Sequence, residues 1–394
     1  MTDISVAGGV YYERCTWPNW DQIFGSGGRA AAALRGLVDH VCLHAYATAE
    51  LVEAFDANRS LYDFEFTPAP AEQAISFDYV HSLSVPVVRP TPTLIRRQAP
   101  LQVSAEVVLR FGMMEGTAIV EADRCIYDPQ SAYKPEPFDY NGSKAQHLAL
   151  VANHSELLAL GEGAPPLDTA RSLIAKQAAE VIVIKAGVAG AQVVEAGSET
   201  HVPAFCTDSV WSVGSGDVFA AAFAAQWGTR GCPAVEAAQF ASRAVAEYVS
   251  KMALPISAAP SGNLPVATAK PGLVYLASPF FTMGQRWLVE EARRGLAALG
   301  MRVFSPFHDV GPGPAHEVAP ADIVALDRCD VVFAILDGLD SGTVFEVGYA
   351  RAKGKPIYAL AQAVVPEDLK MIEGTECRLF TDFVTALHHV AWRT

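Results

Sequence analysis

The chain has 394 residues, of which 51% are hydrophobic and 18% charged, and its net charge is -14. This length exceeds one ordinary hydrophobic core, so two globular domains are expected. The negative charge argues against a nucleic-acid polymer or an anionic membrane as partner. No apolar run approaches a membrane span and the start lacks a signal-peptide pattern, so we expect a cytoplasmic protein.

Residues 1–254 alternate strand-like and helix-like segments. Early in this region, Gly27 and Gly28 precede Arg29 and an alanine-rich helix, where the backbone could approach a ligand closely. A simple glycine turn explains the same pattern. Further on, an apolar strand ends at Lys185 and is followed by a loop at Gly187, as at the ligand-binding end of a parallel strand.

A second glycine-rich stretch, Gly214-Ser215-Gly216-Asp217, leads directly into an apolar helix. Amides at a helix start point at a common spot, so this stretch predicts an anion site. Asp217 could take a proton from an attacking hydroxyl while those amides hold a phosphoryl group. Alternatively, Asp217 is only an acid that favours the helix dipole.

Residues 255–272 are rich in Pro, Ala, Ser and Gly without amphipathic period, and we expect a linker there. Residues 273–394 then form a shorter α/β unit. Its central feature is the apolar run 330–336, typical of a buried parallel strand, followed by Asp340-Ser-Gly342-Thr343-Val-Phe-Glu346 at the start of a helix. Thr343 and Glu346 also fit a capping box, which would give Glu346 a purely structural role.

The segment Val213-Gly-Ser-Gly-Asp217-Val-Phe resembles the signature of the ribokinase-like (PfkB) carbohydrate kinases. The Gly27-Gly28 pair, Asn153-His-Ser-Glu156 and Lys185-Ala-Gly187 follow in that family's order. The resemblance covers about residues 5–254. It implies a three-layer α/β fold for this domain, and ATP and Mg²⁺ as its cofactors.

Roles in such a kinase follow from the resemblance. Asp217 is implied as the catalytic base, and Asn153 and Glu156 as residues that help to place magnesium. The implied substrate- and phosphate-binding residues are Gly27, Gly28, Arg29, Lys185, Gly187, Gly214, Ser215 and Gly216. The chain departs from the family at Arg29, where an asparagine is usual, and at Trp211, where an aspartate is usual.

The C-terminal region resembles the nucleoside 2-deoxyribosyltransferases and their nucleotide N-glycosidase relatives. The resemblance is carried by Val274-Tyr275-Leu-Ala-Ser278-Pro-Phe, by Ala321-Asp322-Ile, and by the stretch from Asp340 to Ala350. It implies a smaller doubly wound, flavodoxin- or Rossmann-like parallel sheet, and a domain whose activity needs no cofactor.

In that family, Glu346 would be the nucleophile that forms a glycosyl-enzyme ester, and Tyr275 would orient it. Asp322 and Asp340 would bind and protonate the nucleobase, with Ser278 and Gly342 in the substrate site. An N-glycosidic bond breaks through an oxocarbenium-like state, so a carboxylate beneath the sugar and a proton for the base are the groups required.

Together these patterns predict a bifunctional nucleoside or nucleotide salvage enzyme that acts on small molecules, and the resemblance implies a homo-oligomer. Two alternatives remain open. In one, only the C-terminal domain is catalytic and the kinase-like domain is a scaffold, as Arg29 and Trp211 allow. In the other, the whole protein is a nucleotide-binding sensor.

Overall fold

The chain forms two compact units. The computed structural model describes residues 2–131, 134–176, 178–260 and 262–393. One unit comprises Met1–Thr207 and Trp211–Val266, and the other Asp208–Val210 and Ala267–Thr394. The division after Val266 falls inside the segment expected as linker. The first part of that segment belongs to the first unit, because Ile256 is buried there and its amide donates to the Ala33 carbonyl at 3.2 Å. Within the described ranges, no helix is both long and apolar enough to cross a membrane.

A nine-stranded sheet forms the centre of the first unit, in the order β13-β12-β11-β10-β9-β8-β1-β4-β5. The seven strands from β11 to β5 pair in parallel, whereas β12 and β13 extend one edge by antiparallel pairing. Their bounds are β1 Asp3–Ala7, β4 His40–Ala47, β5 Glu65–Pro70, β8 Leu101–Phe111, β9 Ala118–Asp128, β10 Lys144–Asn153, β11 Val181–Lys185, β12 Ala191–Glu195 and β13 Ser198–Val202.

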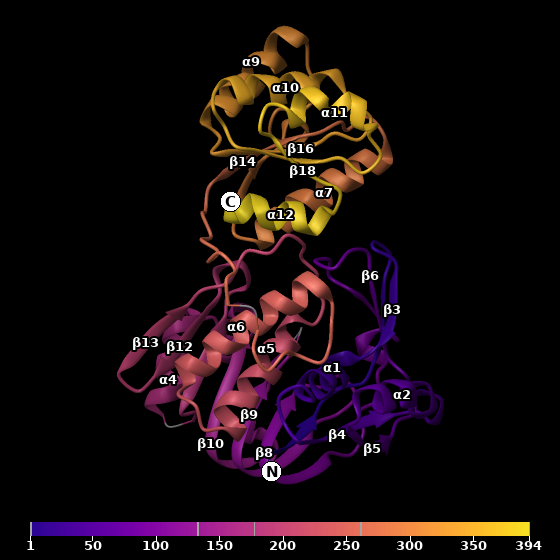
Figure 1. The fold of residues 1–394 in the computed structure, drawn as a ribbon, viewed down its shortest axis with the longest axis vertical. Coiled ribbons are helices and arrows are strands. Elements are labelled where there is room, and N and C mark those ends of the chain that lie inside the picture. Colours follow the sequence, from indigo (N-terminus) through magenta and orange to yellow (C-terminus); the bar gives the residue numbers. More distant parts are fainter. Residues whose placement is uncertain (1, 132–133, 177, 261, 394) are drawn as a thin grey trace. The chain divides into compact units, whose positions relative to one another are not determined.

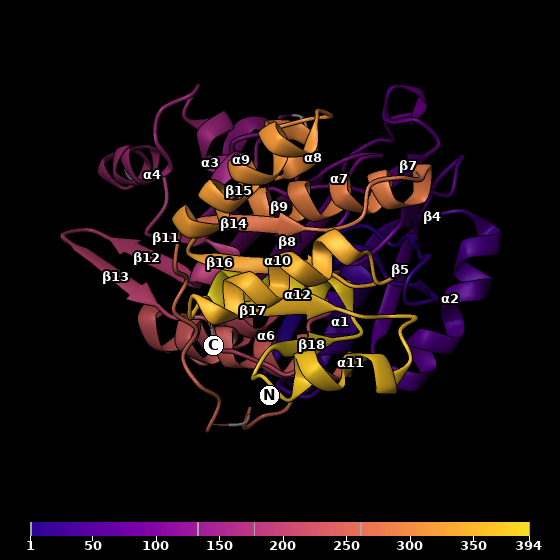
Figure 2. The ribbon, with the colours of Figure 1, turned by 90° about the horizontal axis from the view of Figure 1, so that it is seen from above.

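Helices cover both faces of this sheet. On one face, Leu157 of α3 and Ala170 of α4 pack against Leu150 and Ile182 of the sheet. Helix α5 packs against both α1 and α6, and Figure 2 shows α6 on the opposite side of the sheet from α3 and α4. The bounds are α1 Gly25–Leu34, α2 Ala49–Tyr62, α3 His154–Leu160, α4 Pro166–Ala175, α5 Ser215–Phe223 and α6 Ala234–Lys251. The expected three-layer α/β architecture is confirmed.

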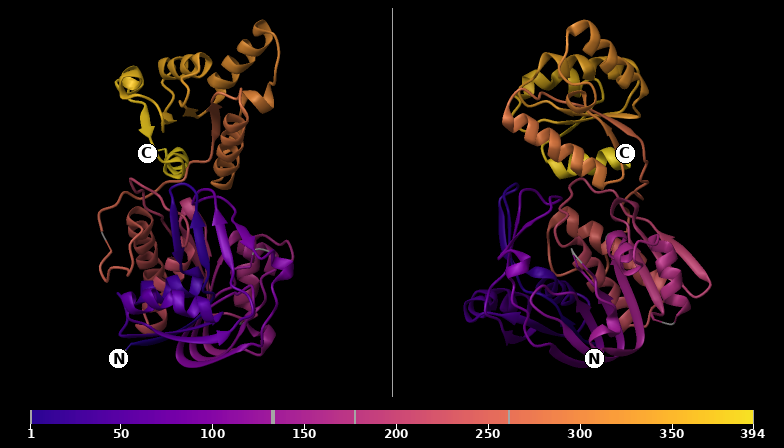
Figure 3. Two further views of the ribbon diagram at one scale, coloured as in Figure 1. Left: turned by 90° about the vertical axis from the view of Figure 1, so that its right-hand side faces the viewer. Right: turned by 180° about the vertical axis from the view of Figure 1, so that it is seen from behind.

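A separate four-stranded sheet, in the order β3-β2-β6-β7, belongs to the same unit. Its strands are β2 Tyr12–Cys15, β3 Trp20–Ile23, β6 Ser76–Tyr79 and β7 Val87–Arg89. Figure 1 labels β3 and β6 beyond the end of α1, and Figure 3 shows these indigo strands apart from the main sheet. This small sheet adds side chains that the main sheet does not provide.

The second unit contains a parallel five-stranded sheet in the order β15-β14-β16-β17-β18. The strands are β14 Leu273–Ala277, β15 Arg302–Phe304, β16 Val331–Ile335, β17 Ile357–Leu360 and β18 Arg378–Phe380. Numbered within the unit, the order is 2-1-3-4-5, that of a flavodoxin-like doubly wound fold, as expected. The strand order reverses between β14 and β16, where such folds bind ligands.

Two helix layers enclose this sheet (Figure 1). Helices α9 and α10 lie on one face, where Leu326 and Val347 join the core around Tyr275, and α7 and α12 lie on the other. The bounds are α7 Met283–Ala298, α8 Pro306–Asp309, α9 Ala315–Arg328, α10 Ser341–Ala352, α11 Pro366–Glu373 and α12 Phe383–Trp392. Helix α9 begins at Ala315 and contains Pro320.

Candidate active sites in the two units

Tyr275 and Glu346 form the centre of the C-terminal candidate site. Tyr275 lies in the middle of β14 and is fully buried, and Glu346 lies in the second turn of α10, the helix that follows β16. The Tyr275 hydroxyl donates a hydrogen bond to Glu346 Oε1 at 2.6 Å. The pair spans the point where the strand order reverses, so a core tyrosine fixes the carboxylate at the expected ligand-binding edge.

The start of α10 differs from the capping box that the sequence suggested. Asp340, not Thr343, is the N-cap, and its Oδ2 accepts from the Thr343 amide at 2.9 Å and from the Thr343 hydroxyl at 3.1 Å. A Cβ on Gly342 would lie 3.0 Å from this oxygen, so a glycine leaves room for the folded-back carboxylate. Because Asp340 satisfies the first turn, Glu346 is available to Tyr275.

Burial and neighbouring acids make Glu346 hard to ionise. Burial raises the pKa of Glu346 to about 7, the Tyr275 hydrogen bond opposes that rise, and the charges of Asp322 and Asp340 add to it. Burial also raises the pKa of Asp322 on α9, whose Oδ1 is buried without a hydrogen-bond partner in the described part of the chain. The three predicted carboxylates therefore influence one another electrostatically, and Asp322 keeps an acceptor or proton-bearing oxygen available.

Two further residues at this edge have plain positions. Ser278 is buried directly after β14. Asp337, which follows β16, accepts hydrogen bonds from the amides of Gln362 and Ala363 at 2.9 and 2.7 Å. Asp337 thus joins the loops that follow two neighbouring strands.

The N-terminal candidate site is a cavity of about 390 Å³ at the carboxyl ends of the parallel strands. Asn153 and Lys185 end β10 and β11, and both line the cavity. Glu13, Phe77 and Tyr79 reach it from the small sheet. Most residues predicted for the kinase site line this one cavity: Arg29, Asn153, Glu156, Lys185, Gly187, Gly214, Gly216 and Asp217.

Lys185 lies beside the start of α5. A Cβ on Gly216 would be 3.6 Å from Lys185 Nζ, and α5 has no side-chain cap on its first turn. The Lys185 ammonium also pairs with the fully buried Asp128, the last residue of β9. Burial raises the pKa of Asp128 to about 7 against the opposing influence of Lys185. A cation and open helix amides at one place are the groups that a phosphate needs.

Asn153 and Glu156 have a structural role beside the implied metal role. The Asn153 side chain accepts from the Glu156 amide at 2.9 Å, and Glu156 accepts from the Asn153 amide at 2.8 Å, which is a complete capping box on α3. Among the described residues, no group of three His, Cys, Asp or Glu side chains is placed to hold a metal ion. The side-chain oxygens of Asn153 and Glu156 fit a magnesium ion that keeps several waters and takes most of its other ligands from a nucleotide.

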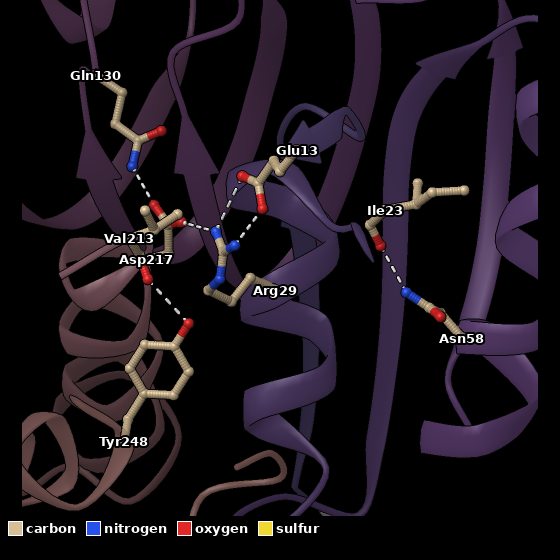
Figure 4. A network of polar contacts seen from close by, with 8 residues as sticks. All are labelled: Glu13, Ile23, Arg29, Asn58, Gln130, Val213, Asp217 and Tyr248. Carbon is tan, nitrogen blue, oxygen red and sulfur yellow. Dashed lines mark hydrogen bonds and ion pairs between the residues drawn. The ribbon is translucent and has the colours of Figure 1, made fainter. Parts of the chain in front are cut away.

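Arg29 of α1 lies between two carboxylates, and Figure 4 shows it between Glu13 and Asp217. It is 1% exposed, its Nη1 lies 2.8 Å from Asp217 Oδ2 and 3.3 Å from Glu13 Oε1, and its Nη2 contacts Glu13 Oε2. Gln130 donates to the other oxygen of Asp217. The guanidinium is thus engaged by acids within the protein rather than left open to a phosphate.

Gly214 makes this position of Arg29 possible. Its φ is +76°, and a Cβ there would lie within 2.4 Å of three Arg29 side-chain atoms. By contrast, Gly27 and Gly28 lie inside α1 rather than in a turn before it. A Cβ on Gly27 would lie 2.7 Å from the Gly8 carbonyl, so this glycine lets α1 cross closely over the end of β1. Neither Gly27, Gly28 nor Ser215 is among the described residues that line the cavity.

Sequence reasoning missed several residues around the cavity. Asp128 and Gln130 follow a parallel strand at its carboxyl end, and that position was a usable signal. Glu13 lies in a short strand of the small sheet, and its neighbours along the chain carry no such signal. Tyr11 donates to Glu115 at 2.7 Å, and burial raises the pKa of Glu115 to about 7.

Comparisons with known proteins match each unit separately. Residues 121–259 match the model of the pfkB family carbohydrate kinases, and residues 274–374 match the model of the nucleoside 2-deoxyribosyltransferases. Both resemblances expected from the motifs are therefore confirmed. No curated protein matches the chain in a sequence search.

Solved structures similar to this chain include kinases of the ribokinase group. A fructokinase double mutant from Vibrio cholerae O395, solved with fructose, ADP and potassium ion, is 12% identical with a TM-score of 0.50, over 64% of this chain and 93% of that one. The ribokinase from Thermotoga maritima is 15% identical with a TM-score of 0.46, over 64% and 94%. Phosphofructokinase-2 from Escherichia coli with fructose-6-phosphate is 14% identical with a TM-score of 0.46, over 63% and 94%. At these identities, the fructokinase match supports the fold of the first unit alone.

Proposed function

We propose that this chain, which joins a PfkB-like kinase domain to a nucleoside 2-deoxyribosyltransferase-like domain, breaks the N-glycosidic bond of a nucleoside or nucleotide at its C-terminal site. The observation that carries this proposal is the 2.6 Å hydrogen bond from the buried Tyr275 to Glu346 at the switch point of the sheet. A hydrogen bond from a fixed core residue holds one carboxylate oxygen and leaves the other to attack a sugar.

In the proposed reaction, a Glu346 oxygen attacks the anomeric carbon and forms a glycosyl ester. The electrons of the breaking carbon–nitrogen bond go to the nucleobase. Asp322 and Asp340 bind the base, and Asp322 supplies the proton, since burial favours its protonated form. Water or a second base then attacks the same carbon, loses its proton to Asp322 and releases Glu346, which gives hydrolysis in one case and transfer in the other.

The raised pKa of Glu346 sets a condition on this chemistry. Attack requires the ionised carboxylate, whose pKa is about 7, and Tyr275 favours that form. A bound substrate would place its partly positive anomeric carbon next to Glu346, which would favour the ionised carboxylate further. We therefore expect the first step to accelerate as the pH rises through about 7.

The test measures, by chromatography, the release of free base from a panel of nucleosides and 5′-nucleotides. Wild type is compared with Glu346→Gln and with Glu317→Gln, a control on α9 whose side chain is 70% exposed. We expect release by wild type and the control and none by Glu346→Gln, and an added second base distinguishes transfer from hydrolysis. If no panel member releases base with wild type, the proposal is wrong.

As a second candidate function, we propose that the N-terminal unit is a kinase of a sugar or nucleoside that uses ATP and Mg²⁺. The cavity supports it, because Lys185 and the uncapped start of α5 lie together beside Asp217. The nucleotide phosphates would contact Lys185 and the α5 amides, Asn153 and Glu156 would help to hold the metal through water, and Asp217 would accept the proton. The expected homo-oligomer and cytoplasmic location belong to this proposal as well.

A further inference from the structure

We propose that Glu13 and Arg29 form a built-in inhibitory contact that keeps Asp217 from acting as a base in the N-terminal site. This inference rests on the proposed kinase function of that site. It starts from the Glu13–Arg29–Asp217 cluster, in which residues far apart in the sequence form ion pairs inside one cavity.

Arg29 occupies the side of Asp217 that an acceptor hydroxyl needs. A general base must contact the hydroxyl at hydrogen-bond distance, and Asp217 Oδ2 has Arg29 Nη1 at 2.8 Å instead. The second oxygen accepts from Gln130. Asp217 is only 7% exposed, and each of its two oxygens already contacts a side chain of the protein.

Glu13 holds Arg29 in place. Its two oxygens face both terminal nitrogens of the guanidinium, and it is 4% exposed. A bidentate pair fixes the direction of the guanidinium more strongly than a single contact does. Glu13 belongs to the small sheet, Arg29 to α1 and Asp217 to α5, so three elements determine the inhibitory contact.

The cluster is also unsuited to receive an anionic substrate through Arg29. Two carboxylates surround one guanidinium, so the cluster carries a net negative charge, and an incoming phosphate would be repelled. Phosphate is better received at Lys185 and the α5 start, which line the same cavity. Arg29 therefore acts on the base and not on the substrate.

A charge-matched double variant tests the inference. Glu13→Gln with Arg29→Gln removes one negative and one positive charge, so the cluster keeps its net charge, which Asp217 then carries alone with its hydrogen bond from Gln130. The control is Arg171→Gln with Glu199→Gln, which removes an exposed ion pair of the same unit. The readouts are ADP formation from MgATP with a panel of sugars and nucleosides, and MgADP binding by calorimetry.

We expect wild type, control and double variant to bind MgADP equally. We also expect the double variant to form ADP at least tenfold faster than wild type, and a further Asp217→Asn change to abolish that gain. Circular dichroism reports whether each variant is folded.

Three outcomes would overturn the inference, and they separate it from the kinase proposal. If wild type turns over as fast as the double variant, Arg29 does not inhibit, and the kinase proposal stands. If all variants bind MgADP and none turns over, the contact is not what limits the site. If none binds MgADP, both the inference and the kinase proposal are wrong.

Discussion

Replacing Glu346 with glutamine should stabilise the C-terminal unit at alkaline pH. The pKa of Glu346 is about 7 in the folded protein, against 4.5 for an unperturbed glutamate, mainly because of burial. Between these values the folded state binds more protons than the unfolded state, so wild type loses stability as the pH rises through that window. Glutamine carries no charge, still accepts from Tyr275, and avoids this loss.

The size of the effect follows from the pKa. Each pKa unit corresponds to about 1.4 kcal/mol. The rise from 4.5 to about 7 should therefore make Glu346→Gln more stable than wild type by about 3 kcal/mol at pH 8 and by about 1 kcal/mol at pH 5. The argument depends on the difference between the stability gains at pH 8 and at pH 5, because effects of the substitution that do not depend on pH cancel in that difference.

Hydrogen exchange of peptides from β16 is the suitable assay, because β16 is fully buried and reports on the C-terminal unit by itself. Glu317→Gln is the control and should stay within about 0.5 kcal/mol of wild type at both pH values. An equal effect of Glu346→Gln at pH 5 and pH 8, or no gain at pH 8, would show that Glu346 ionises normally and would refute the account of the site.

Substitutions at three neighbouring residues test the rest of the site. Tyr275→Phe removes the hydrogen bond that favours ionised Glu346, so the acidic limb of the pH–rate profile for base release should move up by about one pH unit or more, and an unmoved limb would contradict this role. Asp340→Ala should cost about 1 kcal/mol because it removes the cap of α10, whereas Asp340→Asn should keep the unfolding free energy measured in urea. If Asp340→Asn also keeps full base release, its proposed contact with the nucleobase is wrong. Asp337→Ala should lower stability by about 1 kcal/mol or less, since it removes two hydrogen bonds to amides that water can reach, and should leave base release within threefold of wild type.

The sequence alone predicted the two folds well. Apolar runs such as Val331–Ile335 are buried on both faces and form central parallel strands, so their composition reports their environment directly. The glycine-rich motif at Asp217 pointed to a helix start and the motif at Glu346 to a helix after a buried strand, and the structure contains both. These features depend on neighbours along the chain, and a sequence displays those.

The local chemistry at each site was decided by tertiary contacts. Asp340 and Thr343 are both able to cap a helix, and in the structure Asp340 does so. Glu346, which the sequence offered to the cap, instead contacts Tyr275, 71 residues away. Arg29 pairs with Glu13 and with Asp217, at separations of 16 and 188 residues. A sequence shows which charges exist, but the partner of a buried charge depends on which elements the fold brings together, since only there is water excluded and the pairing obligatory.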